Sequence, residues 1–300
     1  MDCRPVHTGV MALVLGAWSS ASMAQGGAVW TLDAGVVHQP SVSLDGGGDV
    51  DSVRAYTEIG RSWNTGARAR LGLSLGYGEQ HYDISGAGFA ANDPWGRIRE
   101  LRLGARYLHQ LESPWTLFLL PSLRFSAESG AALDDGATVG MLAGGTYRFN
   151  ENLSIGPGIG VFTEIEDDVS VFPVLLLDWS LTDRLSLESG RGFAASRGPG
   201  LQLRWRFEST WDFAVGGRYE KVRFRLDDDA PGAGGVGEDA SVPVFAVASY
   251  HASRDTTVSL LVGAQTSATL RLEDRGGALV QEADADTGVF YGLTLRARLP

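Results

Sequence analysis

The chain has 300 residues, a net charge of −11 and 44% hydrophobic residues, with aromatic residues along its whole length. This hydrophobic content excludes a disordered chain. An acidic chain whose single lysine is Lys221 is poorly suited to phosphate backbones, so we expect no nucleic-acid partner.

The N-terminus has the pattern of a secretory signal. Arg4 and His7 precede an apolar stretch, Val10–Trp18, and small residues follow as far as Ala24. We predict a signal peptide at 1–24, cleaved after Ala24, and a single mature domain at 25–300. The apolar stretch is about half the ~20 residues of a spanning helix, and no later stretch reaches that length. The predicted cleavage removes Cys3, so the mature chain has no disulfide or thiolate metal site.

The rest of the chain alternates with a period of two. Between Arg68 and Tyr77, odd-numbered residues are apolar or aromatic, and even-numbered residues are arginine, serine or glycine. A β-strand places such residues on opposite faces, which predicts one apolar and one polar face. The pattern recurs at 100–109, 115–125, 139–149, 153–161, 201–207, 211–219 and 289–299.

Short and long connections between the predicted strands alternate along the chain. The short turns are 64–66, 112–114, 150–152, 182–184, 208–210 and 253–255. The longer links are 38–50, 83–96, 128–136, 166–170, 191–199, 227–240 and 274–287. This arrangement predicts an all-β fold, a transmembrane antiparallel up-and-down β-barrel of fourteen strands, in the cell outer membrane of a Gram-negative bacterium. Weak patterns at 30–36 and 186–190 leave twelve strands as the alternative.

Aromatic residues flank the short turns on the apolar side of their strands. They are Trp63, Tyr107, Trp115, Tyr147, Phe149, Trp179, Phe207, Trp211 and Tyr250. Rings at one height that all face outward predict a girdle at the periplasmic membrane interface. A soluble β-sandwich gives no reason for this placement.

Three segments of the second half carry a family resemblance. They are Gly156–Phe162, Arg197–Phe207 and Trp211–Leu226. Together they resemble an uncharacterised family of proteobacterial outer-membrane β-barrel proteins, a domain of unknown function. The resemblance implies a barrel in the outer membrane and carries no catalytic residue. The chain departs from the usual aromatic end of such barrels, because it closes with Arg298, Leu299 and Pro300.

The polar face carries arginine at many positions, opposed by carboxylates such as Glu58, Glu100 and Asp212. Nine of these arginines are predicted to line a pore: Arg68, Arg70, Arg102, Arg106, Arg148, Arg204, Arg206, Arg296 and Arg298. The inward glycines are expected to keep the wall thin and the lumen open. We therefore expect a porin-like passive pore for small polar solutes. The alternative is a structural or adhesive barrel with a closed lumen and internal salt bridges.

Enzyme chemistry has one candidate, His251-Ala252-Ser253, a His-x-Ser triplet that looks like that of outer-membrane lipid A deacylases. The next strand offers Gln265 where a carboxylate is needed to orient the base, so we predict a solvated turn histidine and no enzyme. A lipid hydrolase is the third hypothesis for function.

The outer loops contain acidic clusters at 166–168, 227–229, 238–239 and 282–286. None has the spacing of a calcium loop, so we expect solvated surface, no metal and no cofactor. The partners expected for such a barrel are outer-membrane lipid, lipopolysaccharide and the barrel assembly machinery.

Overall fold

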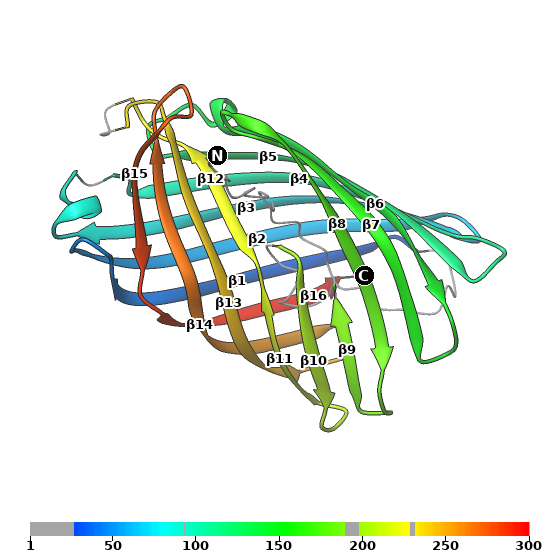
Figure 1. Ribbon diagram of the computed structural model, residues 1–300. Coiled ribbons are helices and arrows are strands. Elements are labelled where there is room, and N and C mark those ends of the chain that lie inside the picture. The colour runs from blue at the N-terminus through cyan, green and yellow to red at the C-terminus, as the bar shows by residue number, and fades with distance from the viewer. Residues whose placement is uncertain (1–26, 93, 190–197, 229–231, 300) are drawn as a thin grey trace, which may run out of the picture.

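The computed structural model describes residues 27–299 except 93, 190–197 and 229–231, so the predicted signal peptide lies outside the described residues. Sixteen strands form one sheet (Figure 1). They are β1 (Val29–Ser43), β2 (Asp49–Gly66), β3 (Ala69–Ser85), β4 (Arg97–Gln110), β5 (Trp115–Glu128), β6 (Ala137–Arg148), β7 (Leu153–Glu164), β8 (Asp167–Ser180), β9 (Leu185–Ser189), β10 (Gly200–Arg206), β11 (Trp211–Arg218), β12 (Glu220–Arg225), β13 (Val236–His251), β14 (Thr256–Glu273), β15 (Leu279–Ala285) and β16 (Gly288–Leu299).

Two short 3-10 helices, η1 (Gly88–Asn92) and η2 (Leu133–Gly136), lie in links of the outer end, opposite the short turns. Within the described ranges, no helix is long and apolar enough to cross a membrane.

The sheet closes on itself as an antiparallel barrel. Strands pair with their neighbours along the chain, and β1 pairs with β16 from Trp30 opposite Leu299 to His38 opposite Tyr291. β13 pairs with both β11 and β12, and β14 pairs with both β15 and β16, so each of these pairs is one interrupted strand. The barrel therefore has fourteen strands, as predicted, and the two weak patterns are β1 and β9.

The outer surface of the barrel is apolar, as the alternation predicted. Leu73, Leu103 and Leu260 expose 51%, 42% and 61% of their surface. Beside the short turns, aromatic rings of neighbouring strands touch, and the ring centroids of Trp211 and Tyr250 are 5.0 Å apart. Since an apolar belt bounded by rings fits a bilayer, this surface is the lipid-facing one.

The strands of the outer end are longer than predicted. β1 continues to Ser43, β13 begins at Val236, and β15 lies within the predicted link 274–287. Irregular register accompanies this extension, between Gln39 and Val42 and between Ala240 and Val242. Such irregularities change which residues face inward. A prediction based on strict alternation therefore ends each strand at the irregularity and makes it too short.

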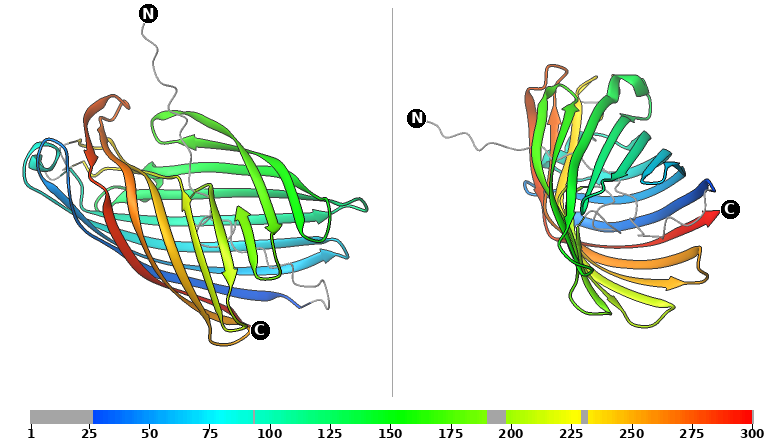
Figure 2. Two further views of the ribbon diagram at one scale, coloured as in Figure 1. Left: turned by 60° about the horizontal axis from the view of Figure 1, so that its bottom comes forward. Right: turned by 90° about the vertical axis from the view of Figure 1, so that its right-hand side faces the viewer.

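Among the described residues the strands differ in length. β2 has 18 residues, whereas β9, β10 and β11 have 5, 7 and 8. The described part of β9 pairs with β8 from Asp178 opposite Glu188 to Ser180 opposite Ser186. Figure 2 shows these short strands at one side of the barrel, near the short turns.

Replacing Leu103 with arginine places a charge on the lipid-facing wall, and we expect the folded barrel to lose about 2–4 kcal/mol of stability. The measurement is the urea midpoint of unfolding in lipid vesicles. The control is Gly104→Ala on the lumen side, where a new Cβ meets only the Ser74 hydroxyl, at 2.7 Å. Equal losses at the two positions would show that the faces are reversed.

Candidate functional site

The outer end of the lumen is filled with apolar side chains. Phe89, Trp95 and Phe224 are buried there, and the rings of Trp95 and Phe224 meet edge to face at 5.2 Å. We call this set the outer apolar cluster. It comprises Val42, Leu44, Val50, Tyr82, Ile84, Phe89, Ala90, Trp95, Ile98, Val222, Phe224, Leu226, Leu270, Leu272 and Ala283.

β12 stands inside the barrel. One of its faces carries Val222 and Phe224, which pack on lumen-facing side chains of β3 and β4. Its other face carries Lys221 and Arg223, which bind Glu164 on the lumen side of β7. Because both faces touch lumen-facing side chains of other strands, β12 lies inside the outer end of the barrel while it stays paired with β13. The sequence predicted one extra residue here, which would turn Val222, Phe224 and Leu226 outward. That prediction is wrong, because β11 and β12 pair with β13 in one continuous register and these side chains keep the inward parity of Asp212.

An ion-pair cluster fills the space between β12 and the β7–β8 hairpin. Arg223 donates to Glu238 at 2.6 Å and to Glu273 at 2.5 Å. Lys221 donates to Glu164 at 2.9 Å. Glu238 is therefore a buried partner of β12, which corrects the prediction of a solvated acidic cluster at 238–239. Asp239 likewise accepts a hydrogen bond from Tyr82, at 2.7 Å.

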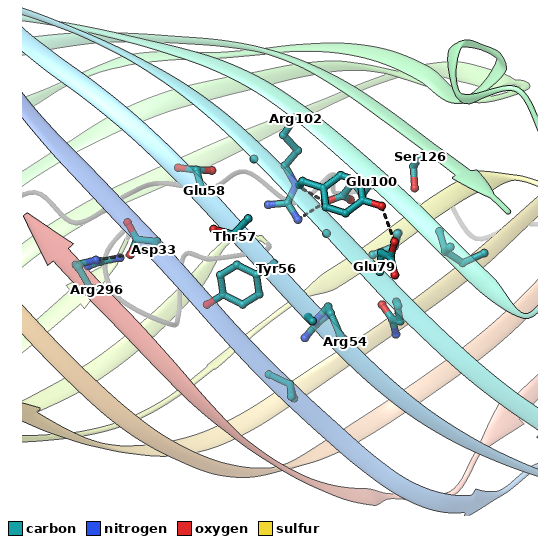
Figure 3. A pocket seen from close by; sticks show the side chains of 18 of the residues that line it. Asp33, Arg54, Tyr56, Thr57, Glu58, Glu79, Glu100, Arg102, Ser126 and Arg296 are labelled. Atoms are coloured by element: carbon teal, nitrogen blue, oxygen red, sulfur yellow. Dashed lines mark hydrogen bonds and ion pairs between the residues drawn. The ribbon is translucent and has the colours of Figure 1, made fainter.

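A cavity of about 90 Å³ lies in the lumen next to the outer apolar cluster. Its polar lining comes from β1, β2, β3, β4, β5, β11 and β16. In Figure 3, labelled side chains of β1, β2, β4 and β16 surround the same space. The charged residues on its wall include Asp33, Arg54, Glu58, Glu100, Arg102, Arg218 and Arg296. Val37, Ile98 and Val222 add apolar surface.

The arginines of the cavity are held by carboxylates. Arg54 and Arg218 both bind Glu220, at 2.7 and 2.8 Å. Arg296 binds Asp33 at 2.5 Å, which joins β16 to β1 across the closure of the barrel. Arg102 and Arg124 share Glu100 in the same way. A guanidinium that is paired and hydrogen-bonded keeps its charge in a confined lumen and has a fixed position.

The nine arginines predicted to line a pore lie at several levels. Arg102 and Arg296 line the cavity. Arg204 binds Asp212, and Arg70 donates to Ser62 at 2.8 Å. Arg68 lies in the short turn and binds Glu112 of the next turn at 3.1 Å. The remaining four stand on β4 or at the short-turn ends of β6, β10 and β16: Arg106, Arg148, Arg206 and Arg298.

Sequence reasoning did not single out two residues of the cavity lining. Tyr56 has the same parity as Arg54 and Glu58, so alternation alone places it inside. Val222 was missed because the sequence analysis assumed an extra residue before it, whereas unbroken alternation from Asp212 places it inside.

Aromatic rings cover many of the inward glycines. A Cβ added at Gly144, Gly160 or Gly263 would lie 2.5 or 2.6 Å from a ring of a nearby strand. The rings belong to Phe118, Phe172 and Phe290 respectively. These glycines therefore make room for inward rings, a recognised way of covering glycine in sheets, and they do not widen the lumen as predicted.

His251 belongs to a hydrogen-bond chain across three strands. Its Nε2 is 2.7 Å from an Asp212 oxygen, and its Nδ1 is 3.0 Å from the Thr257 hydroxyl. The carboxylate that sequence reasoning sought on the following strand is supplied by the preceding one, β11. The Ser253 hydroxyl accepts a hydrogen bond from the Asp255 N–H at 3.1 Å, which stabilises the turn. The prediction of a solvated histidine is therefore wrong.

No group of three or more histidine, cysteine, aspartate or glutamate side chains able to hold a metal ion occurs among the described residues.

No protein-family model and no curated protein matches this sequence. Among solved structures, the barrel is similar to an outer membrane channel from Pseudomonas putida F1, at 12% identity and a TM-score of 0.48, over 99% of this chain and 100% of that one. It is also similar to a FadL homologue from Pseudomonas aeruginosa, at 10% identity and a TM-score of 0.47, over 90% of each chain. The toluene transporter TodX from Pseudomonas putida has 12% identity and a TM-score of 0.44, over 93% and 91%.

The barrel itself defines the class of protein. Its backbone hydrogen bonds close in a ring, its outer surface is an apolar belt with aromatic rings, and its lumen carries paired charges. Only closed barrels and helices satisfy every backbone group within lipid. The chain is an outer-membrane β-barrel protein.

Gly160→Ala should destabilise the barrel by about 1–3 kcal/mol, because its Cβ meets the Phe172 ring at 2.5 Å. Gly72→Ala is the matched control on another wall, where the nearest atom is 3.6 Å away, and its effect should stay within about 0.5 kcal/mol. Thermal unfolding followed by the gel shift between folded and unfolded barrel measures both. A neutral Gly160→Ala would contradict the ring packing.

Proposed function

We propose that this protein is an outer-membrane channel for small polar solutes, with a charged lumen that β12 closes at its outer end. The observation that carries the proposal is the cavity beside β12, whose wall includes Arg54, Arg102 and Arg296. A barrel with a purely structural role has no need to keep charged side chains around an internal space, since desolvating them costs free energy.

The segment that closes the outer end of the lumen, β12, is short. β12 has 6 residues and is attached to β13 by strand pairing, while its contact with β5 is a single bridge between Arg225 and Ala127. The β12 face opposite Phe224 is held by ion pairs.

The second candidate is a structural barrel with a closed lumen. The outer apolar cluster favours it, because Trp95 and Phe224 are 1% and 0% exposed and pack as in a protein core. The two candidates differ in one respect, which is whether the lumen conducts when this packing is weakened.

Lipid is the first partner that we propose. The apolar belt provides the contact with acyl chains, and lipopolysaccharide would meet the exposed acidic and basic groups of the outer end. Insertion by the barrel assembly machinery follows from the same class of fold. The exposed pair of Arg275 and Asp228, 2.5 Å apart, belongs to this outer surface.

Phe224→Ser should raise steady conductance in planar bilayers several-fold above wild type, because it removes the ring that packs on Trp95 and Tyr82. The matched control is Leu260→Ser, which makes the same kind of change on the lipid-facing wall, where Leu260 is 61% exposed. Heat-modifiable migration on gels verifies that each variant is folded. Folded Phe224→Ser barrels without conductance would refute the channel and support the structural barrel.

The conducting form should prefer anions weakly, because Arg70 and Arg148 stand near the short-turn mouth and narrow walls screen their charge incompletely. The reversal potential in a tenfold KCl gradient measures this preference. Arg70→Ala combined with Arg148→Ala should reduce it, and Arg61→Ala should not, because Arg61 lies over the Trp30 ring. A cation preference that the double variant leaves unchanged would contradict the expectation.

A further inference from the structure

Among the described residues, two opposite charges of the lumen, Glu58 and Arg106, form no hydrogen bond or ion pair with another side chain. Glu58 lines the cavity, yet it makes no hydrogen bond or ion pair with any described residue. In Figure 3 no dashed line reaches it, whereas dashed lines join Arg296 to Asp33 and Arg102 to Glu100. Arg106 stands on β4, four residues beyond Arg102, and it also has no bonded partner in the described part of the chain.

Both side chains stand on the lumen face, Glu58 on β2 and Arg106 on β4, the two neighbours of β3. Their charges interact electrostatically without a direct hydrogen bond. The carboxylate and the guanidinium each keep hydrogen-bonding capacity for a third group.

The stretch of β3 between Glu58 and Arg106 presents small residues to the lumen. β3 separates β2 from β4, and register places Gly76 beside Glu58 and Gly72 beside Arg106. A Cβ at Gly76 would lie 3.4 Å from a Glu58 carboxylate oxygen, so this side chain leans over the glycine. No ring is among the three atoms nearest to a Cβ at either glycine, unlike the ring-covered glycines of the other walls. The floor of the site therefore consists of Gly72, Gly76 and the short side chain of Ser74 between them.

We propose that Glu58 and Arg106 form a binding site for a small zwitterion that carries an ammonium and a carboxylate group, such as an amino acid. The ammonium group binds the Glu58 carboxylate, and the carboxylate group binds the Arg106 guanidinium. The proposal rests on the proposed channel function, because it names the solute class that the lumen admits.

The charges of the site discriminate against simple ions. A small anion on Arg106 would lie near the Glu58 carboxylate, and a small cation on Glu58 would lie near the Arg102 and Arg106 guanidiniums. Only a ligand with both charges satisfies both groups without repulsion. The Arg54, Arg102 and Arg296 guanidiniums already hold carboxylates, so they fix the shape of the cavity and do not compete for the ligand.

The test measures equilibrium binding to the full-length barrel in detergent, by isothermal calorimetry. The probes are β-alanine, propionate and propylammonium, which share a three-carbon skeleton and differ in charge. We expect β-alanine to bind at least tenfold more tightly than the other two. Glu58→Gln and Arg106→Gln should each weaken β-alanine binding at least tenfold, whereas Glu112→Gln, at an exposed turn, should leave it unchanged.

Other outcomes overturn the proposal. Equal binding of propionate, lost only in Arg106→Gln, would define a simple anion site. Equal binding of propylammonium, lost only in Glu58→Gln, would define a cation site. Absence of β-alanine binding to a barrel whose gel migration shows it folded also refutes the site. Because binding is measured without transport, a barrel that binds β-alanine yet never conducts would refute the channel alone.

Discussion

The structure depends on the requirement that every backbone N–H and C=O within lipid has a partner. The pairing of β1 with β16 completes that ring and removes the free edges of the sheet. The Arg296–Asp33 ion pair crosses the same seam on the lumen side. Once the ring is closed, every second residue is committed to lipid and every other one to the lumen. The apolar belt and the charged interior therefore follow from a single constraint.

Beyond the lipid, backbone groups can also bond to water. A strand at the outer end can therefore lie inside the lumen, as β12 does. β12 continues the register of β11 on β13, and its two faces contact Tyr82 of β3 and Glu164 of β7. Burying the Phe224 ring contributes about 1.5–3 kcal/mol, which favours this inward position. The opposite face of β12 needs charged partners because Lys221 and Arg223 are buried with it, and Glu164, Glu238 and Glu273 supply them. One face of β12 thus packs in the outer apolar cluster, and its other face belongs to a buried ion-pair cluster.

Charged side chains in the lumen lose hydration free energy, and pairing with opposite charges offsets this loss. An unpaired ion in a confined space loses several kcal/mol of hydration, so most inward arginines here are bound to carboxylates. Glu58 and Arg106 depart from this arrangement, and they do so on the wall where β3 presents glycine without a covering ring. Charged groups left without partners beside open space are characteristic of binding sites, because their electrostatic requirement is met only when a ligand arrives.

The sequence by itself determined the barrel, its lipid-facing surface and the inward position of Arg102 and Glu58, because a period of two is a local property that each strand carries. It left twelve or fourteen strands open, and it did not determine what the inward side chains meet. Phe172 covers Gly160 only once β7 and β8 are paired in register, and Phe224 packs on Trp95 only after segments distant in the chain come together. The Asp212–His251 contact likewise joins strands that are paired only in the closed sheet. The tertiary structure alone decided that the second face of β12 meets β7, since a contact between strands far apart in the chain is not part of any local period.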